Sequence, residues 1–308
     1  MKAVLLTAHG GPEMLRYGDA PDPVAGPGQV VVDIHAASVN AADYKVRLGG
    51  GPYTNIHFPH ILGRDFSGVV SAVGTGVTDL AVGDAVFGVT DQRDEGAYAE
   101  KIAIKAAIVA KKPARLSHAE AAAMALTSLT ALWAIEDTAK LKKGETILIQ
   151  GGAGGVAGFA IQLSKHIGAH VITTASAKNH DYVMKLGADR VIDYTAQDFT
   201  KAVSGCDVVF DTVGGNVRAP SYEVLKPGGR LVFISPTPEG FEPPRKDVQT
   251  LRPAVTRDRA HLERMLALLE AGAVWPPNIV RYKLAAAGDA HRVSESRHLQ
   301  GKLIFEVR

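Results

Sequence analysis

One glycine-rich turn restricts the fold of this chain more than any other segment. Residues 150–158 read Gln-Gly-Gly-Ala-Gly-Gly-Val-Ala-Gly and follow a short apolar run, typical of a strand covered on both faces. Gly152, Gly154 and Ala157 fit the spacing G-x-G-x-x-G/A, in which small residues allow a tight turn and close approach of the backbone to a pyrophosphate. The N–H groups that begin the next helix then face the phosphates. The expected dinucleotide contacts in this turn are Gly152, Ala153, Gly154, Gly155 and Val156.

Strand and helix patterns alternate after this turn. The residue patterns predict strands at 146–150, 170–175, 190–193, 206–211 and 230–235, with a further helix at about 257–271. Such alternation is typical of a parallel sheet with helices on both faces. The sequence therefore predicts a doubly wound α/β domain.

The first third of the chain has a different pattern. Residues 1–116 hold short β-branched runs separated by Gly and Pro, which predicts an all-β barrel or sandwich. Ser117 and Glu120 fit a capping box that begins a helix over residues 121–135. A strand is expected again at 302–307. We therefore expect a β-rich domain at 1–117 plus 272–308 and a dinucleotide-binding domain at 118–271.

The second strand of the α/β domain predicts which dinucleotide is bound. Sites that prefer NAD carry Asp or Glu at the end of this strand, where it binds the ribose 2′-OH. Here the strand is followed by Ser176, Lys178 and Asn179, with no carboxylate before Asp181. A hydroxyl, an ammonium and an amide suit a 2′-phosphate, so NADPH is the expected cofactor. The alternative is that Lys178 is a solvated lysine of the turn.

Further contacts are expected where other strands end, because loops at the carboxyl ends line the ligand crevice of such sheets. Tyr194 follows the third strand and either packs near the adenosine or is a surface tyrosine. The remaining candidates, each also compatible with a simple loop, are Val213, Gly214, Ile234 and Ser235.

Composition excludes several classes of protein. The formal net charge is +2 without a basic cluster, so no nucleic-acid partner is expected. No segment approaches the ~20 apolar residues of a membrane span, and the first residues do not fit a signal peptide, so a cytoplasmic location is expected. Cys206 is the one cysteine, which excludes Cys-based zinc sites and an intramolecular disulfide. A site built from His57, His60 and carboxylates stays open, but we expect no metal.

Six segments of the chain fit one known pattern: Met1–Val4, Asn40–Arg47, Leu62–Val70, Gly151–Val156, Leu186–Asp189 continuing to Asp193-Tyr194, and Gly301–Ile304. Together they resemble the medium-chain dehydrogenase/reductase superfamily, and within it the zinc-free quinone oxidoreductases and enone reductases of the zeta-crystallin group. Three departures stand out. Ala157 replaces a glycine, and Gly63-Arg64-Asp65 stands where zinc enzymes of the superfamily have Gly-His-Glu. Residues 236–247 are too few for the helix that normally precedes the last Rossmann strand.

The resemblance implies a chaperonin-10-like β-barrel into which a Rossmann domain is inserted. It also implies that Asn40 and Lys45 face the nicotinamide, that Thr130 contacts the cofactor and that Tyr53 lies at the substrate entrance. The alternatives for these positions are a turn-capping Asn40, a surface Lys45 and a core-packed Tyr53.

The function implied is NADPH-dependent hydride transfer to a quinone or an α,β-unsaturated carbonyl without a metal, catalysed with Asn40, Lys45 and Tyr53. A homodimer joined near residues 248–251 is expected, because proteins cover the edges of their sheets. Two alternatives stay open: a zinc-independent alcohol or aldehyde dehydrogenase, and a non-catalytic NADPH-binding sensor or crystallin-type protein.

Overall fold

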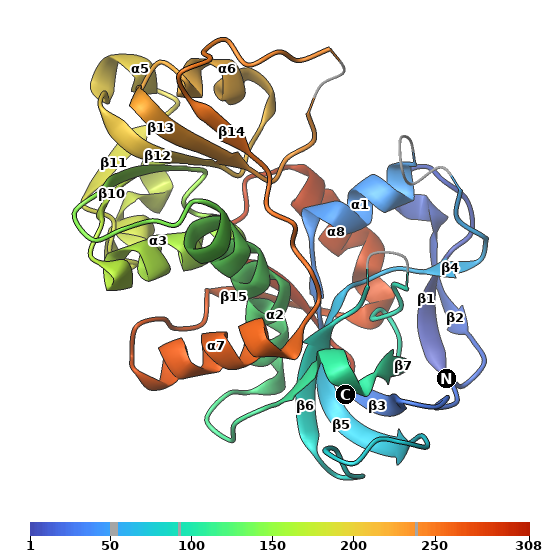
Figure 1. The fold of residues 1–308 in the computed structure, drawn as a ribbon. Coiled ribbons are helices and arrows are strands. Elements are labelled where there is room, and N and C mark those ends of the chain that lie inside the picture. The colour runs from blue at the N-terminus through green and yellow to red at the C-terminus, as the bar shows by residue number, and fades with distance from the viewer. Residues whose placement is uncertain (50–54, 92–93, 238–239) are drawn as a thin grey trace. The chain divides into compact units, whose positions relative to one another are not determined.

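The computed structural model describes residues 1–49, 55–91, 94–237 and 240–308, and these divide into two compact units (Figure 1). The antiparallel unit comprises Met1–Leu126, Arg257–Arg264 and Pro276–Arg308. The parallel-sheet unit comprises Thr127–Thr256 and Met265–Trp275. Among the described residues, no helix has the length and apolar character needed to cross a membrane.

The antiparallel unit is organised around one long strand, β3 (Gln29–Val39). This strand pairs with β5 (Asp65–Val73), β7 (Lys101–Lys105) and β16 (Lys302–Glu306), all antiparallel. The strand order is β15-β16-β3-β5-β6-β8, with β7 also on β3. The return of the C-terminal segment to this sheet is confirmed. The remaining strands are β6 (Ala85–Val89), β8 (Val109–Lys111) and β15 (Ile279–Lys283), with β1 (Lys2–Leu6), β2 (Leu15–Asp19) and β4 (His60–Ile61) in a second sheet.

The all-β prediction for residues 1–116 is wrong at residues 41–48, which form a helix. Helix α1 (Ala41–Leu48) follows β3 directly, with Asn40 as its N-cap residue. The Asn40 backbone N–H donates to Asp43 Oδ2 at 2.8 Å, which satisfies one donor at the start of the helix. The helices of this unit also include α8 (Ala287–Glu295) and the 3₁₀ turns η1 (Pro12–Met14), η3 (Ala106–Ile108) and η7 (Leu284–Ala286).

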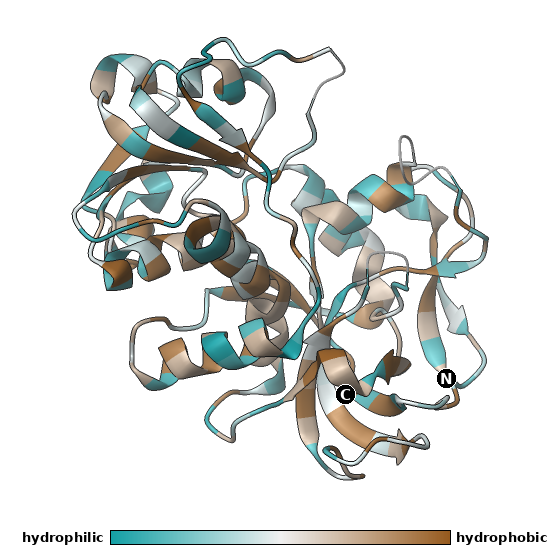
Figure 2. Cartoon of the chain, in the orientation of Figure 1, coloured by the Kyte–Doolittle hydropathy of each residue, from teal (hydrophilic) through white to brown (hydrophobic). Residues whose placement is uncertain are grey.

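Apolar side chains of several strands form the core of the antiparallel unit. Leu6, Ile34, Phe66 and Phe305 are completely buried within one cluster. Figure 2 shows the corresponding apolar colour along much of β5 and β6. Val39 at the end of β3 and Leu303 near the start of β16 belong to the same cluster.

The parallel-sheet unit has six parallel strands in the order β11-β10-β9-β12-β13-β14. The first four predicted strands are confirmed. The fifth strand is only partly confirmed: it was predicted at 230–235, whereas β13 begins at Leu225 and ends at Phe233. Residues 226–229 have no partner on β12, because the register shifts between the pairs Cys206–Leu225 and Val208–Arg230. The strands are β9 (Thr146–Gln150), β10 (His170–Ala175), β11 (Arg190–Asp193), β12 (Cys206–Asp211), β13 (Leu225–Phe233) and β14 (Gln249–Leu251).

Helix α2 (His118–Leu132) begins where the capping box predicts, since Glu120 Oε2 accepts from Ser117 N at 2.8 Å and Glu120 N donates to Ser117 Oγ at 3.2 Å. It continues into a π-helical stretch, η4 (Trp133–Thr138). No helix lies between β13 and β14 among the residues described there. The other helices are α3 (Gly155–Ile167), η5 (Ala177–Asn179), α4 (His180–Lys185), α5 (Phe199–Ala202), η6 (Gly215–Val217), α6 (Arg218–Ser221) and α7 (Arg259–Glu270).

Candidate active site

The phosphate turn joins β9 to α3 at the point where the strand order reverses, between β10 and β12. In open α/β sheets this is where ligands bind. A Cβ on Gly152 would lie 2.2 Å from Thr173 Oγ1, and Thr173 is fixed because its hydroxyl donates to Ile149 O at 2.7 Å. Gly151 N donates to Thr174 Oγ1 at 3.0 Å, which holds the start of the turn. Position 152 therefore accepts only glycine. The resulting turn exposes backbone that can approach a pyrophosphate closely.

The three residues predicted to select NADPH follow the end of β10. Asn179 is buried, and its amide donates to Ser176 Oγ at 3.3 Å. Ser176 therefore keeps its own hydroxyl hydrogen, while Lys178 is exposed on the short helix η5. Tyr194, at the end of the adjacent strand β11, is 50% exposed, so it is not a core tyrosine. These positions share one edge of the sheet with the phosphate turn.

A buried arginine connects the loops that follow β12 and β13. Asp211 Oδ1 accepts from the N–H groups of Val213 and Gly214 at 2.9 and 2.7 Å, and its Oδ2 pairs with Arg218 Nε at 3.2 Å. The Arg218 guanidinium also donates to the Ser235 carbonyl oxygen at 3.1 Å and to the Ser235 hydroxyl. The Asp211–Arg218 pair thus holds three of the four residues that were predicted to line the ligand crevice in these loops, namely Val213, Gly214 and Ser235.

Arg218 is held from its other side by aromatic rings. The guanidinium carbon lies 4.2 Å from the centre of the Phe233 ring and 5.9 Å from that of Phe241. Such cation–π contacts stabilise a buried arginine. Phe241 lies in the short segment between β13 and β14, so Arg218 anchors this segment as well. Nothing in the sequence pattern singles out Arg218, because its partners come from separate strands.

In the antiparallel unit, Asn40 is enclosed by two charged side chains. Its Nδ2 donates to Asp65 Oδ2 at 3.1 Å, and its Oδ1 accepts from Lys302 Nζ at 2.8 Å. Asp65 also accepts from the Ser38 hydroxyl. Burial raises the pKa of Asp65 and lowers that of Lys302, and each shift is opposed by the partner's charge. Sequence reasoning missed Asp65 and Lys302 as functional residues, although both lie in segments that carry the family resemblance.

A second buried polar chain starts at Asp43, three residues after Asn40. Tyr98 donates to Asp43 Oδ2 at 2.7 Å, His291 Nε2 lies 3.3 Å from the Tyr98 oxygen, and Arg47 Nε donates to His291 Nδ1 at 3.2 Å. Because arginine is always a donor, His291 Nδ1 is the acceptor and Nε2 carries the hydrogen. Burial raises the pKa of Asp43 to about 7 and, with Arg47, lowers that of His291 to about 3. This chain fixes α1 against α8.

Lys45 lies on α1, one turn after the N-cap. In the described part of the chain its ammonium has no hydrogen-bond or ion-pair partner. Burial lowers its pKa, and the charges of Arg297 and Arg64 lower it further. A partly buried cation beside two others is well suited to stabilise an anionic oxygen. Tyr53 lies outside the described residues, and Thr130 is a buried residue of α2 in the parallel-sheet unit.

The position equivalent to a zinc-binding Gly-His-Glu holds an ion pair. Arg64 Nε donates to Glu95 Oε1 at 2.9 Å, and Glu95 Oε2 lies 3.0 Å from His60 Nε2. Within the described ranges no three His, Cys, Asp or Glu side chains are grouped as a metal site. Burial raises the pKa of the Cys206 thiol to about 12, so this cysteine is not a nucleophile at neutral pH.

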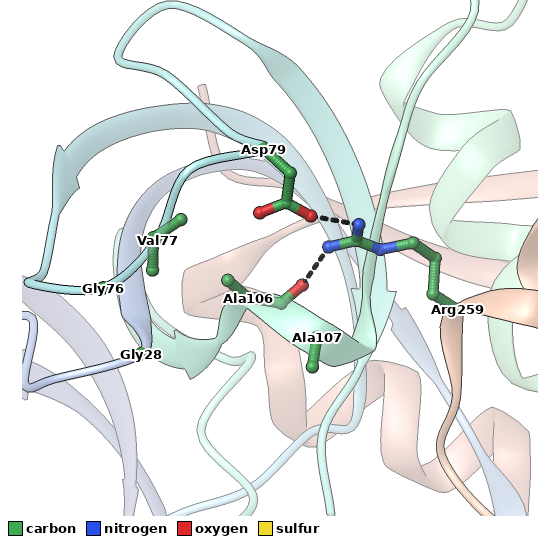
Figure 3. A pocket seen from close by; sticks show the side chains of 7 residues that line it. All are labelled: Gly28, Gly76, Val77, Asp79, Ala106, Ala107 and Arg259. Carbon is green, nitrogen blue, oxygen red and sulfur yellow. Dashed lines mark hydrogen bonds and ion pairs between the residues drawn. The ribbon is translucent and has the colours of Figure 1, made fainter.

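One surface pocket lies in the antiparallel unit, away from these residues. Figure 3 shows the Arg259 guanidinium pointing toward the Asp79 carboxylate and the Ala106 carbonyl oxygen, while Gly28 and Gly76 line the opposite side of the pocket. Since the guanidinium is already paired by the protein, the pocket offers no free charged group. None of the predicted site residues lines it.

Two segments of the chain match known dehydrogenase families. Residues 26–114 match the family described as alcohol dehydrogenase GroES-like domain, and residues 186–305 match the family described as zinc-binding dehydrogenase. The chain is 36% identical over 287 residues to a 2-methylene-furan-3-one reductase of Solanum lycopersicum, covering 90% of this chain and 71% of that protein. It is 32% identical over 317 residues to a chloroplastic NADPH-dependent alkenal/one oxidoreductase of Arabidopsis thaliana, covering 99% and 79%.

A solved structure is similar over the entire chain. The quinone oxidoreductase from Coxiella burnetii superposes with a TM-score of 0.93 at 35% identity, covering 100% of this chain and 99% of that one. Fold, phosphate turn and similarity define an oxidoreductase that binds NAD(P)H. The chain belongs to the medium-chain dehydrogenase/reductase superfamily, in its group of quinone oxidoreductases and alkenal/one reductases. The absence of zinc remains a prediction.

Proposed function

We propose that this protein is an NADPH-dependent reductase that transfers hydride to a quinone or an α,β-unsaturated carbonyl without a metal. The observation that carries the proposal is the phosphate turn at the switch point, next to a strand end with Lys178 and no acid. An ammonium at this position favours the 2′-phosphate of NADPH over the free 2′-OH of NADH. The name of the Arabidopsis relative, an NADPH-dependent oxidoreductase of alkenals and enones, supports the same cofactor and substrate class.

The chemistry divides between cofactor and protein. NADPH supplies, when bound, a hydride from C4 of the nicotinamide. Asn40 and Lys45 donate hydrogen bonds to the substrate carbonyl oxygen, on which negative charge accumulates as the hydride adds to the β-carbon of an enone. Donors placed for the developing oxyanion lower the barrier. A proton from water then reaches the α-carbon of the enolate and completes the reduction. For a quinone, the hydride and one water proton yield the hydroquinone.

A saturated ketone gains less from such a site. Its alkoxide is a much stronger base than an enolate or a hydroquinone anion, and it normally needs a Lewis acid or a dedicated proton donor. We therefore expect quinones and enones to be reduced faster than the matching saturated ketone.

The experiment is an assay of NADPH oxidation with a quinone, a short enone and its saturated ketone, using NADPH deuterated at C4. We expect deuterium at the β-carbon of the enone product. Lys45→Ala should lower kcat roughly ten- to a thousandfold, the range for loss of one oxyanion donor. Fastest reduction of the saturated ketone would favour the dehydrogenase alternative, and no turnover with any acceptor would favour the non-catalytic one. Full turnover by Lys45→Ala would remove Lys45 from the mechanism.

We further propose a homodimer joined along β14, which lies at one edge of the six-stranded sheet. An unpaired edge strand offers N–H and C=O groups to a second copy of the chain. Light scattering at micromolar concentration measures the mass directly, and a mass of one chain would contradict this proposal.

A further inference from the structure

Lys302 and Asp65 approach Asn40 from two neighbouring strands. Lys302 begins β16 and Asp65 begins β5, and both strands pair with β3, which ends just before Asn40. Asn40, the residue after β3, therefore lies between Lys302 and Asp65, the first residues of the two neighbouring strands. Lys302 Nζ donates to Val39 O and to Asn40 Oδ1, each at 2.8 Å, and lies 3.9 Å from Asp65 Oδ2.

Both charged groups are removed from solvent. Lys302 is 4% exposed and Asp65 is 0% exposed. Buried charges are costly unless they are paired and hydrogen-bonded, and a buried ion pair is weak evidence of a contribution to stability. Orienting a neighbouring polar group is another role that such a pair can have.

The Lys302–Asp65 pair determines the orientation of the Asn40 side-chain amide, with its oxygen toward Lys302 and its nitrogen toward Asp65. Its oxygen accepts from an ammonium and its nitrogen donates to a carboxylate, so both hydrogen bonds are charge-assisted. Rotating the amide by half a turn would direct its oxygen at the Asp65 carboxylate and its NH₂ group at Lys302. Both contacts would then be repulsive in a site of low dielectric. One orientation of the amide is therefore strongly preferred.

This orientation leaves one Nδ2 hydrogen of Asn40 without a protein acceptor in the described part of the chain. We propose that Lys302 and Asp65 are positioning residues that direct this hydrogen toward the reacting molecule. The proposal rests on the proposed function, in which Asn40 is a donor to the substrate oxygen. It adds two residues that touch neither substrate nor cofactor and act through Asn40.

The kinetic test is a double-mutant cycle on the full chain, with Lys302→Met and Asn40→Ala singly and together. We expect Lys302→Met to lower kcat roughly ten- to a hundredfold, within the range for an oxyanion donor, with little change in KM. In the Asn40→Ala background the same substitution should change kcat by less than about twofold, because coupled residues are not additive. Losses that multiply in the double variant would overturn the proposal, since a purely structural role predicts that result.

Two further variants keep the kinetic test interpretable. Lys101→Met breaks another lysine–carboxylate pair of the same sheet, between Lys101 Nζ and Asp33 Oδ1 at 2.8 Å, and should leave kcat unchanged. If Lys302→Met does not fold, Lys302→Met with Asp65→Asn removes both charges and keeps the shapes of the side chains. This variant should also lose roughly ten- to a hundredfold in kcat. Wild-type kcat in it would overturn the proposal.

A second measurement does not depend on turnover. The side-chain amide of Asn40 gives one pair of ¹⁵N–¹H signals, identified by its loss in Asn40→Ala. We expect this pair to be sharp in the wild-type protein and broadened or shifted in Lys302→Met, but unchanged in Lys101→Met. An unchanged pair in Lys302→Met would overturn the proposal. If the wild-type protein reduces none of the acceptors, the proposed function fails while the amide signals still decide whether the charge pair orients Asn40.

Discussion

The buried carboxyl of Asp43 gives a prediction about stability and pH. Asp43 is completely buried and accepts hydrogen bonds from Asn40 N and the Tyr98 hydroxyl through one oxygen, and burial raises its pKa from 3.8 to about 7. In the folded protein this carboxyl stays protonated up to nearly neutral pH, whereas in the unfolded chain it is ionised above pH 3.8. Its contribution to stability is therefore fully present below pH 3.8 and is lost as the pH rises to about 7.

The magnitude follows from the shift. At about 1.36 kcal/mol per pKa unit, the complete change is about 4 kcal/mol, and roughly 3 kcal/mol of it falls between pH 5 and 8. Asp43→Asn cannot ionise, and its side-chain oxygen can accept the same two hydrogen bonds. The free energy of unfolding of Asp43→Asn, relative to that of the wild-type protein, should therefore rise by roughly 3 kcal/mol over this range.

Urea unfolding followed by circular dichroism at pH 5, 6, 7 and 8 measures this difference. Asp33→Asn is the matched control, because Asp33 is a carboxyl of the same unit whose pKa is lowered, in part by its hydrogen bond to Lys101. Its stabilisation is present above pH 3.8 and is lost only at lower pH, so the control should show no rise between pH 5 and 8. A difference between Asp43→Asn and wild type that stays constant from pH 5 to 8 would refute the assignment of a neutral buried carboxyl.

Two further predictions concern the parallel-sheet unit. Lys178→Ala should weaken NADPH binding by about 1–3 kcal/mol, the scale of a charge-assisted hydrogen bond, and should leave NADH binding nearly unchanged. Fluorescence titration with both nucleotides measures the two affinities. Equal losses of affinity for NADPH and NADH would contradict the role of Lys178. Arg218→Met should lower the free energy of unfolding by about 3–5 kcal/mol, because it leaves the buried Asp211 carboxylate without its ion pair. Urea unfolding measures the loss, and a change below about 1 kcal/mol would show that the two backbone N–H groups already compensate Asp211.

The parallel-sheet unit was largely predictable because its signals are local. Strands such as β9 and β12 are apolar runs covered on both faces, and the phosphate turn needs small residues within a span of nine positions. The capping box at Ser117 is equally local, and it placed the start of α2 correctly. The start of β13 was missed because Leu225 and Arg230 pair with β12 while residues 226–229 between them do not, and Gly228 has a positive φ of 77°.

The antiparallel unit was harder to predict. Helix α1 has eight residues and only a weak apolar pattern, and its one clear signal was Asn40 followed three positions later by Asp43, a helix-capping pair. The surroundings of Asn40 could not be derived from the sequence, because its partner Lys302 is 262 positions away. Arg218 was missed because local sequence carries no information on its contacts: Asp211 is the last residue of β12, whereas Phe233 and Ser235 lie at and beyond the end of β13.

The late position of β16 has a consequence for how the protein is made. Strands β3 and β5 are synthesised early. Lys302, which donates a hydrogen bond to Val39 at the end of β3, is synthesised 263 residues after Val39. Until β16 arrives, one side of β3 from Ala36 to Val39 has no partner strand, while all six strands of the parallel-sheet unit have already been synthesised. Exposed strand edges promote misassembly, and units of a chain fold as they emerge. We therefore expect the dinucleotide-binding sheet to fold first and the hydrogen bond between Asn40 and Lys302 to form only after β16 has been synthesised.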